Sequence, residues 1–94
     1  MTADLTVFII AKNEENNIRK CILSAKELAS EIIVVDSESS DRTVQMAKEA
    51  GAEVYIRPFD NFSAQKSFAL GKVRTPWALN LDADETLTPQ LCEE

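Results

Sequence analysis

Two aspartates one residue apart, Asp82 and Asp84, are the side chains of this sequence best suited to chemistry. They follow an apolar run in which Trp77, Leu79 and Leu81 supply the apolar face of a predicted strand. In an extended chain both carboxylates would lie on one face, with Cα atoms roughly 6.5 to 7 Å apart. Such a pair repels unless a positive charge lies beside it. Mg²⁺ or Mn²⁺, which takes oxygen ligands and can hold substrate phosphates, is therefore the expected partner.

Other interpretations of the same acids remain open at this point. The segment could be a solvated acidic turn before the next element, because turns favour aspartate. It also matches, in letters, the Asp-x-Asp-x-Thr nucleophile motif of phosphatases of the haloacid dehalogenase type, with Thr86 as the last residue. An EF-hand loop beginning at Asp82 is excluded, because Leu87 replaces the glycine that its sixth position requires and Pro89 interrupts the loop.

Composition excludes several classes of protein. The net charge of -6, without clustered Lys or Arg, argues against nucleic-acid binding. The sequence contains no His, so this segment has neither His-based acid-base catalysis nor His-ligated metal. The length of 94 residues suits one small domain but is short for an enzyme with two substrates. We therefore expect residues 1–94 to be one domain, or a fragment, of a longer protein.

The predicted location is intracellular. Cys21 and Cys92 are too few and too far apart in sequence for a disulfide framework or a zinc site, which favours a reducing compartment. The N-terminus has no positively charged start, and its apolar run of only about seven residues is too short for a signal peptide or a membrane span.

The acids must be positioned by an alternation of strands and helices. Predicted strands cover residues 5–11, 31–36 and 52–56 and the run from Trp77; predicted helices begin at the cap residues Asn13, Asp41 and Ser63 and reach about residues 29, 50 and 70. Gly51 and Gly71 are expected to end the second and third helices. This order predicts an α/β fold with a mostly parallel sheet, right-handed crossovers and helices on both faces.

Polar residues follow three of the predicted strands, where parallel sheets bind ligands. Lys12, Asn13 and Glu14 follow the first strand, Asp36 ends the second, and the Asp82/Asp84 pair ends the fourth. No glycine-rich phosphate loop is present, since the only glycines are Gly51 and Gly71. If a nucleotide binds at this edge, the charge of its diphosphate would have to be neutralised by a metal on Asp84 and by a side chain such as Lys66. Asp36 could accept hydrogen bonds from a base or ribose, or could simply cap the following helix.

Four segments together resemble the inverting family 2 glycosyltransferases of the GT-A fold. They are Ile-Ile-Ala-Lys-Asn-Glu at 9–14, Val-Asp-Ser-Glu-Ser-Ser-Asp-Arg-Thr at 35–43, Gln-Lys-Ser-Phe-Ala at 65–69 and Leu-Asp-Ala-Asp-Glu at 81–85. The first and last look most like bacterial enzymes that add glucose to the lipopolysaccharide or lipooligosaccharide core. The resemblance implies a Rossmann-like, three-layer nucleotide-diphospho-sugar transferase fold. It also implies that the protein is located in the cytoplasm or at the cytoplasmic face of the inner membrane.

The resemblance also implies roles for individual residues. Ala11, Asn13 and Glu14 would line the uracil and ribose pocket, and Asp36 would hydrogen-bond the base. Lys66 would lie near the diphosphate, Asp82 and Ala83 near the ribose or the sugar, and Asp84, with Asp82, at the metal. The implied partners are a UDP-sugar, a glycolipid or saccharide acceptor and Mg²⁺ or Mn²⁺.

The catalytic base of this family lies downstream of the Asp-x-Asp strand, so we expect it beyond Glu94. The resemblance thus implies that residues 1–94 are a single nucleotide-sugar-binding domain, truncated before the acceptor-binding part. By itself this segment would bind nucleotide weakly and transfer nothing. Two alternatives remain: a phosphatase with Asp82 as nucleophile, although its motif normally follows the first strand, and a non-catalytic nucleotide-binding fragment.

Overall fold

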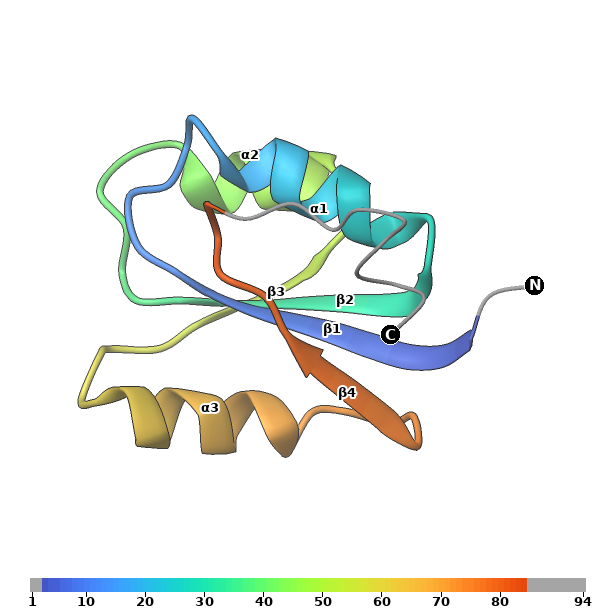
Figure 1. Cartoon of the computed structure of the whole chain (residues 1–94). Coiled ribbons are helices and arrows are strands. Elements are labelled where there is room, and N and C mark those ends of the chain that lie inside the picture. The colour runs from blue at the N-terminus through green and yellow to red at the C-terminus, as the bar shows by residue number, and fades with distance from the viewer. Residues whose placement is uncertain (1–2, 85–94) are drawn as a thin grey trace.

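A computed structural model describes residues 3–84, which form four strands and three helices in strict alternation (Figure 1). In chain order the elements are β1 (Ala3–Ala11), α1 (Ile18–Lys26), β2 (Ala29–Asp36), α2 (Thr43–Glu49), β3 (Glu53–Ile56), α3 (Phe62–Leu70) and β4 (Trp77–Asn80). All strand pairs are parallel, and the strand order is β3-β2-β1-β4. The predicted α/β fold with a mostly parallel sheet is confirmed.

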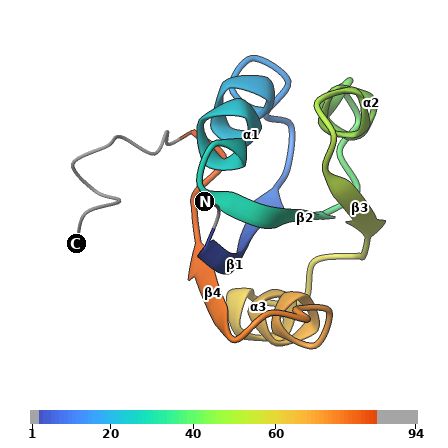
Figure 2. The ribbon, with the colours of Figure 1, turned by 90° about the vertical axis from the view of Figure 1, so that its right-hand side faces the viewer.

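Helices cover both faces of this sheet. Figure 2 shows α1 and α2 on one face and α3 on the other. Val7, Ile9 and Val34 pack toward the α1/α2 face, whereas Phe8 and Ile33 belong to the core beneath α3. The two central strands are apolar in continuous runs because both of their faces are buried. Within residues 3–84, no helix is long and apolar enough to cross a membrane.

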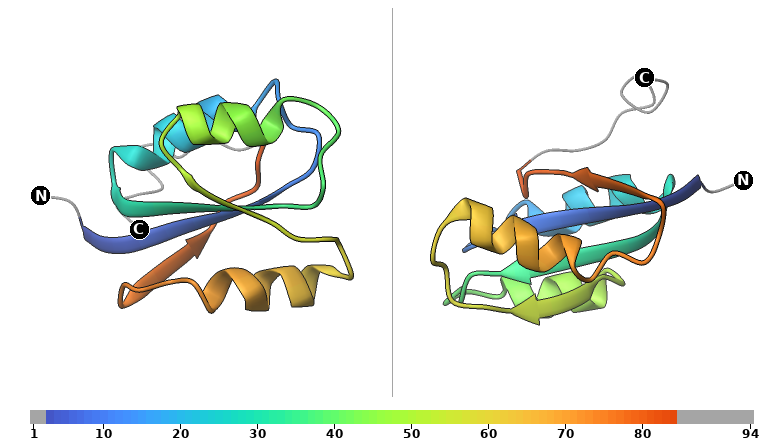
Figure 3. Two further views of the ribbon diagram at one scale, coloured as in Figure 1. Left: turned by 180° about the vertical axis from the view of Figure 1, so that it is seen from behind. Right: turned by 90° about the horizontal axis from the view of Figure 1, so that it is seen from below.

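The strand order reverses beside β1. The chain steps from β1 to β2 and β3, and β4 then returns to the other side of β1, as the views from behind and below show (Figure 3). Ala11 is in register with Asp36, and the Leu81 amide donates to the Phe8 carbonyl at 3.1 Å. The carboxyl ends of β1, β2 and β4 therefore meet at one edge of the sheet, where such folds bind ligands.

Two predicted helix starts are wrong, and a third is shifted by one residue. Arg42, not Asp41, is the N-cap of α2, although the Asp41 carboxylate accepts a hydrogen bond from the Thr43 amide at 2.9 Å. Asn13 does not cap α1, which begins only at Ile18; its φ angle is 53°, a left-handed conformation that asparagine tolerates. Ser63 does not cap α3, because the Asn61 side chain accepts a hydrogen bond from the Ala64 amide at 2.8 Å. Gly51 has the left-handed φ of 100° expected after α2.

The end of β4 also differs from the prediction. The strand ends at Asn80, and the chain turns over residues 83–84, so the predicted extended geometry of the two aspartates is wrong. Trp77 is 68% exposed and Leu79 is 38% exposed, so they do not form a buried face. Alternation nevertheless persists, since Leu81 and Ala83 are buried while Asp82 and Asp84 are exposed. We call residues 81–84 the acid turn.

Candidate functional site

A cavity of about 470 Å³ opens at the edge where the strand order reverses. Its lining comes from the ends of β1, β2 and β4 with the residues that follow them, from the segment that links β3 to α3, and from the first residue of α3. The lining residues are Ile10, Ala11, Lys12, Glu14, Ser37, Phe59, Phe62, Asp82, Ala83 and Asp84. The volume lies within the range of small-molecule sites, and apolar walls with a few polar groups are typical of them.

The cavity brings together five of the side chains predicted for the site. Ala11, Glu14, Asp82, Ala83 and Asp84 all line it. The acids of the first and fourth strand ends therefore share one cavity, as their sequence positions predicted. The other three predicted residues, which are Asn13, Asp36 and Lys66, lie outside its lining.

The acid turn is held in place by contacts with α1. The buried Cys21 thiol donates to the Asp82 carbonyl oxygen at 3.4 Å, and the buried Leu81 and Ala83 belong to the same core cluster as Cys21. These contacts leave the Asp82 and Asp84 side chains exposed at the cavity. The backbone of the turn is thus anchored, while its carboxylates remain accessible to a ligand.

The donor set at the acid turn suits a hard cation that arrives with its substrate. Within residues 3–84 no group of three or more Asp, Glu, Cys or His side chains gathers around one point. Two exposed carboxylates can supply only part of a coordination shell. Mg²⁺ and Mn²⁺ commonly bind one or two carboxylates and fill the other positions with phosphate oxygens and water. Asp82 and Asp84 therefore fit such an ion, with substrate phosphates and water in its other positions.

Asn13 connects the loops that follow β1 and β2. Its amide donates to the Ser39 hydroxyl at 2.8 Å, and its side-chain oxygen accepts from the Ser40 amide at 2.8 Å. The left-handed backbone of Asn13 lets its amide and its side chain reach this neighbouring loop together. In this structure Asn13 shapes the cavity edge from outside the lining.

Asp36 is completely buried at the end of β2. Its two carboxylate oxygens accept hydrogen bonds from the Ser39 amide at 2.7 Å and from the Ser39 hydroxyl at 2.5 Å. Asp36 therefore holds the loop after β2, and the next residue, Ser37, lines the cavity. The role of Asp36 at the base stays a prediction.

Glu14 is positioned at the cavity by the start of α2. The Glu14 amide donates to the Thr43 hydroxyl oxygen at 2.8 Å, and that hydroxyl donates in turn to the Asp41 carboxylate. The Glu15 amide donates to the same carboxylate at 3.3 Å. The hydrogen bond from Thr43 is the main reason that the pKa of Asp41 is lowered below 3.8.

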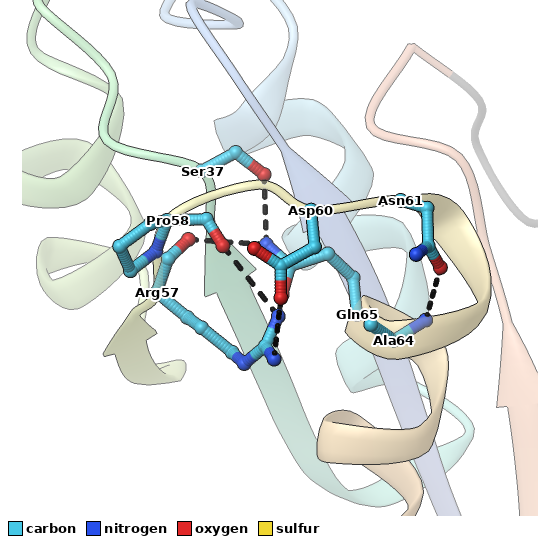
Figure 4. Close-up of polar contacts among 7 residues, drawn as sticks. All are labelled: Ser37, Arg57, Pro58, Asp60, Asn61, Ala64 and Gln65. Carbon is cyan, nitrogen blue, oxygen red and sulfur yellow. Dashed lines mark hydrogen bonds and ion pairs between the residues drawn. The ribbon is translucent and has the colours of Figure 1, made fainter.

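Two cavity-lining aromatic residues were not predicted. Phe59 and Phe62 are 44% and 68% exposed, and their rings meet edge to face with centroids 5.1 Å apart. The segment that carries them is held by the ion pair between Arg57 and Asp60 at 3.1 Å and by the Asn61 cap (Figure 4). The available sequence signal was a pair of aromatic residues flanking the turn-forming Asp60 and Asn61.

Gln65 was also missed, while its neighbour Lys66 was predicted. Lys66 is exposed on α3, whereas Gln65 is completely buried and contacts Ser37 and Arg57 (Figure 4). Its spacing of four residues from the buried Ala69 placed it on the packed face of the predicted helix. That spacing was the signal for a buried polar contact.

Several known proteins of similar sequence are named glycosyltransferases. The family model "Glycosyl transferase family 2" matches residues 6–94. An uncharacterized glycosyltransferase of Rickettsia bellii is 46% identical over 94 residues, which cover 100% of this chain and 32% of the relative. The lipopolysaccharide core biosynthesis glycosyltransferase LpsC of Rhizobium meliloti is 43% identical, with 95% of this chain and 34% of LpsC covered. The chain thus spans about a third of the length of these relatives.

Solved structures of similar fold agree with this result. Mannosyl-3-phosphoglycerate synthase from Rubrobacter xylanophilus superposes with a TM-score of 0.81 at 25% identity, covering 92% of this chain and 32% of that one. Glucosyl-3-phosphoglycerate synthase from Mycobacterium tuberculosis, solved with Mn²⁺, UDP and glucosyl-3-phosphoglycerate, gives 0.75 at 26% identity, covering 84% and 33%. The expected GT-A architecture is confirmed, and the chain belongs to glycosyl transferase family 2.

Proposed function

We propose that the protein containing this chain transfers a sugar from a UDP-sugar and that this segment binds the donor nucleotide. The observation that carries the proposal is the shared cavity, in which carboxylates from the end of β4 face residues from the ends of β1 and β2. The similar glucosyl-3-phosphoglycerate synthase was solved with UDP and Mn²⁺, which supports the same class of ligand here.

The two sides of the cavity suit different parts of a UDP-sugar. We place the diphosphate beside the acid turn, where Asp84, together with Asp82, would hold Mg²⁺ or Mn²⁺. A cation bound there supplies positive charge against the diphosphate leaving group. Ala83 and Asp82 would also contact the ribose or the sugar, and Lys66 would approach the diphosphate from α3.

The nucleoside would occupy the side formed by β1 and β2. Ala11 and Glu14 line this side, and Asn13 shapes it through the Ser39–Ser40 loop. A direct hydrogen bond from Asp36 to the base requires that the carboxylate share or exchange its bonds to Ser39. Asp36 would otherwise act on the base through the loop that it holds.

The reaction we propose is a single displacement with inversion. A base deprotonates the acceptor hydroxyl, the oxygen attacks the anomeric carbon, and the diphosphate leaves. We expect the base downstream of Glu94. The proposed sugar is glucose, the proposed acceptor is a lipopolysaccharide core or related glycan, and the proposed location is the cytoplasmic face of the inner membrane. The similarity to LpsC, a lipopolysaccharide core biosynthesis glycosyltransferase, supports the class of acceptor.

Nucleotide titration of the full-length gene product tests the proposal. UDP should bind, and Mn²⁺ should increase its affinity in isothermal titration calorimetry. Titration of UDP without metal is the comparison for the effect of Mn²⁺, and titration of CDP is the comparison for recognition of the base. Cleavage of a phosphate ester without UDP binding would instead identify a phosphatase, and the absence of both would leave a non-catalytic module.

A further inference from the structure

Gln65 connects α3 to the end of β2 through a buried side-chain amide. Its exposed fraction is 0%, and its amide makes three hydrogen bonds (Figure 4). Oε1 accepts from the Arg57 guanidinium at 2.7 Å, while Nε2 donates to the Arg57 carbonyl at 3.1 Å and to the Ser37 hydroxyl oxygen at 3.0 Å. A completely buried amide with this set of partners is held in one orientation.

The chemistry of Arg57 determines that orientation. A guanidinium can only donate hydrogen bonds, so it must face the oxygen of the amide. A main-chain carbonyl can only accept, so it must face the nitrogen. The nitrogen therefore also faces Ser37, and because it has no acceptor capacity, the Ser37 oxygen must be the acceptor.

This arrangement leaves the Ser37 hydroxyl proton available to another acceptor. Among residues 3–84, the Ser37 hydroxyl makes the hydrogen bond to Gln65 and no other. Ser37 is only 3% exposed, yet it lines the cavity. The cavity is consequently the place where the proton can find an acceptor.

We propose that Gln65 is a positioning residue that keeps the Ser37 hydroxyl as a hydrogen-bond donor toward the nucleoside of the bound nucleotide. This inference rests on the proposed function. β1 separates β2 from β4, so Ser37 lies about 10 Å from the acid turn on strand spacing alone. The donor thus faces the uridine part, whose carbonyl and ribose oxygens accept hydrogen bonds.

Gln65→Glu tests the polarity of this contact with almost no change in shape. The new carboxylate would accept the Ser37 proton, so the donor toward the ligand would be lost. We expect the affinity for uridine to fall about tenfold, the usual cost of a ligand acceptor left unpaired. Uridine is the primary probe because it carries no charge, and UDP should show a similar loss. Both are measured by calorimetry on the full-length gene product.

Two further variants separate this role from simple support of the fold. Gln65→Met removes all three hydrogen bonds but leaves the Ser37 hydroxyl able to donate, so it should weaken uridine less than Gln65→Glu does. Ser37→Ala should weaken uridine about tenfold by itself. Adding Gln65→Glu to Ser37→Ala should then cause no further loss of affinity.

Several results would overturn the inference. They are an equal or larger loss with Gln65→Met, or a further loss when Gln65→Glu is added to Ser37→Ala. If thermal unfolding shows that Gln65→Glu does not fold, the comparison of Ser37→Ala with Gln65→Met decides, and a larger loss in Gln65→Met contradicts the proposal. Failure of the unaltered protein to bind UDP would instead reject the proposed function itself.

Discussion

Asp84 is an exposed carboxylate in the acid turn, and its charge has little part in packing. We predict that Asp84→Asn lowers the Mn²⁺-dependent affinity for UDP about ten- to hundredfold, because a charged ligand to the cation is lost. The melting temperature should not change. UDP titration with Mn²⁺ and thermal unfolding measure the two effects.

Asp4→Asn is the matched control for this change. Asp4 is exposed at the beginning of β1, at the opposite edge of the sheet, and the substitution alters the net charge equally. UDP affinity should therefore be retained in Asp4→Asn. An Asp84→Asn variant that binds UDP normally in the presence of Mn²⁺ would show that the metal contact is wrong.

Asp36 and Ser39 allow a direct role at the base to be distinguished from an indirect one. Asp36→Ala should weaken uridine binding even without metal, either because the base loses a partner or because the loop loses its anchor. Ser39→Ala removes the hydroxyl bond to Asp36 and the acceptor of the Asn13 main-chain amide, but it keeps the Asp36 carboxylate. Equal losses in the two variants, measured by uridine titration, would indicate an indirect role. A loss confined to Asp36→Ala would indicate direct contact, and normal binding in both would contradict any role at the base.

At the scale of elements, α3 depends on its Asn61 cap. Asn61→Ala should lower the free energy of unfolding by about 1 kcal/mol, because the Ala64 amide loses its acceptor. Asn61→Asp keeps an acceptor at that position and is the control. Urea unfolding checks both variants. Equal stability of Asn61→Ala and the unaltered protein would show that the cap is not needed.

The alternation of strands and helices could be predicted because it depends on local patterns. Continuous apolar runs identified β1 and β2, and the position of Gly51 after α2 correctly indicated a left-handed residue. The convergence of Glu14 and Asp84 on one edge then followed from the rules of parallel sheets.

The details of the site depend on which partner each polar side chain takes in the folded chain, and they were not predictable. Asparagine is a common helix cap, but the Asn13 side-chain oxygen instead accepts a hydrogen bond from the Ser40 amide, 27 residues away. Asp36 ends a strand beside the site, yet both of its carboxylate oxygens accept hydrogen bonds from Ser39. The position of Gln65 on a predicted helix did not reveal that its side chain bonds Arg57 and, 28 residues away, the Ser37 hydroxyl.

At the scale of the whole molecule, hydrogen bonds join the α2 start to the β1–α1 segment, and Asp41 is central to them. The folded-state pKa of Asp41 is lowered below 3.8 by the Thr43 hydroxyl bond, so its charged form stabilises the fold. That stability is present above the unfolded pKa and is lost as the pH falls through the folded pKa.

We therefore predict that Asp41→Asn is less stable than the unaltered protein at pH 6 and that the difference narrows below about pH 3.8. Urea unfolding at several pH values measures it. Asp4→Asn, at an exposed position of β1, is the control and should be as stable as the unaltered protein. A pH-independent difference for Asp41→Asn would contradict the assigned cause.

Burial of the Cys21 thiol beneath the acid turn provides a probe of how often this turn separates from α1. A thiol reagent can react with Cys21 only in molecules where the contact to the Asp82 carbonyl has opened. In a Cys92→Ser background, the rate of alkylation therefore reports local opening. If Mn²⁺ and UDP bind across the turn, they should slow alkylation, so that occupancy can be followed by mass spectrometry even when no sugar is transferred.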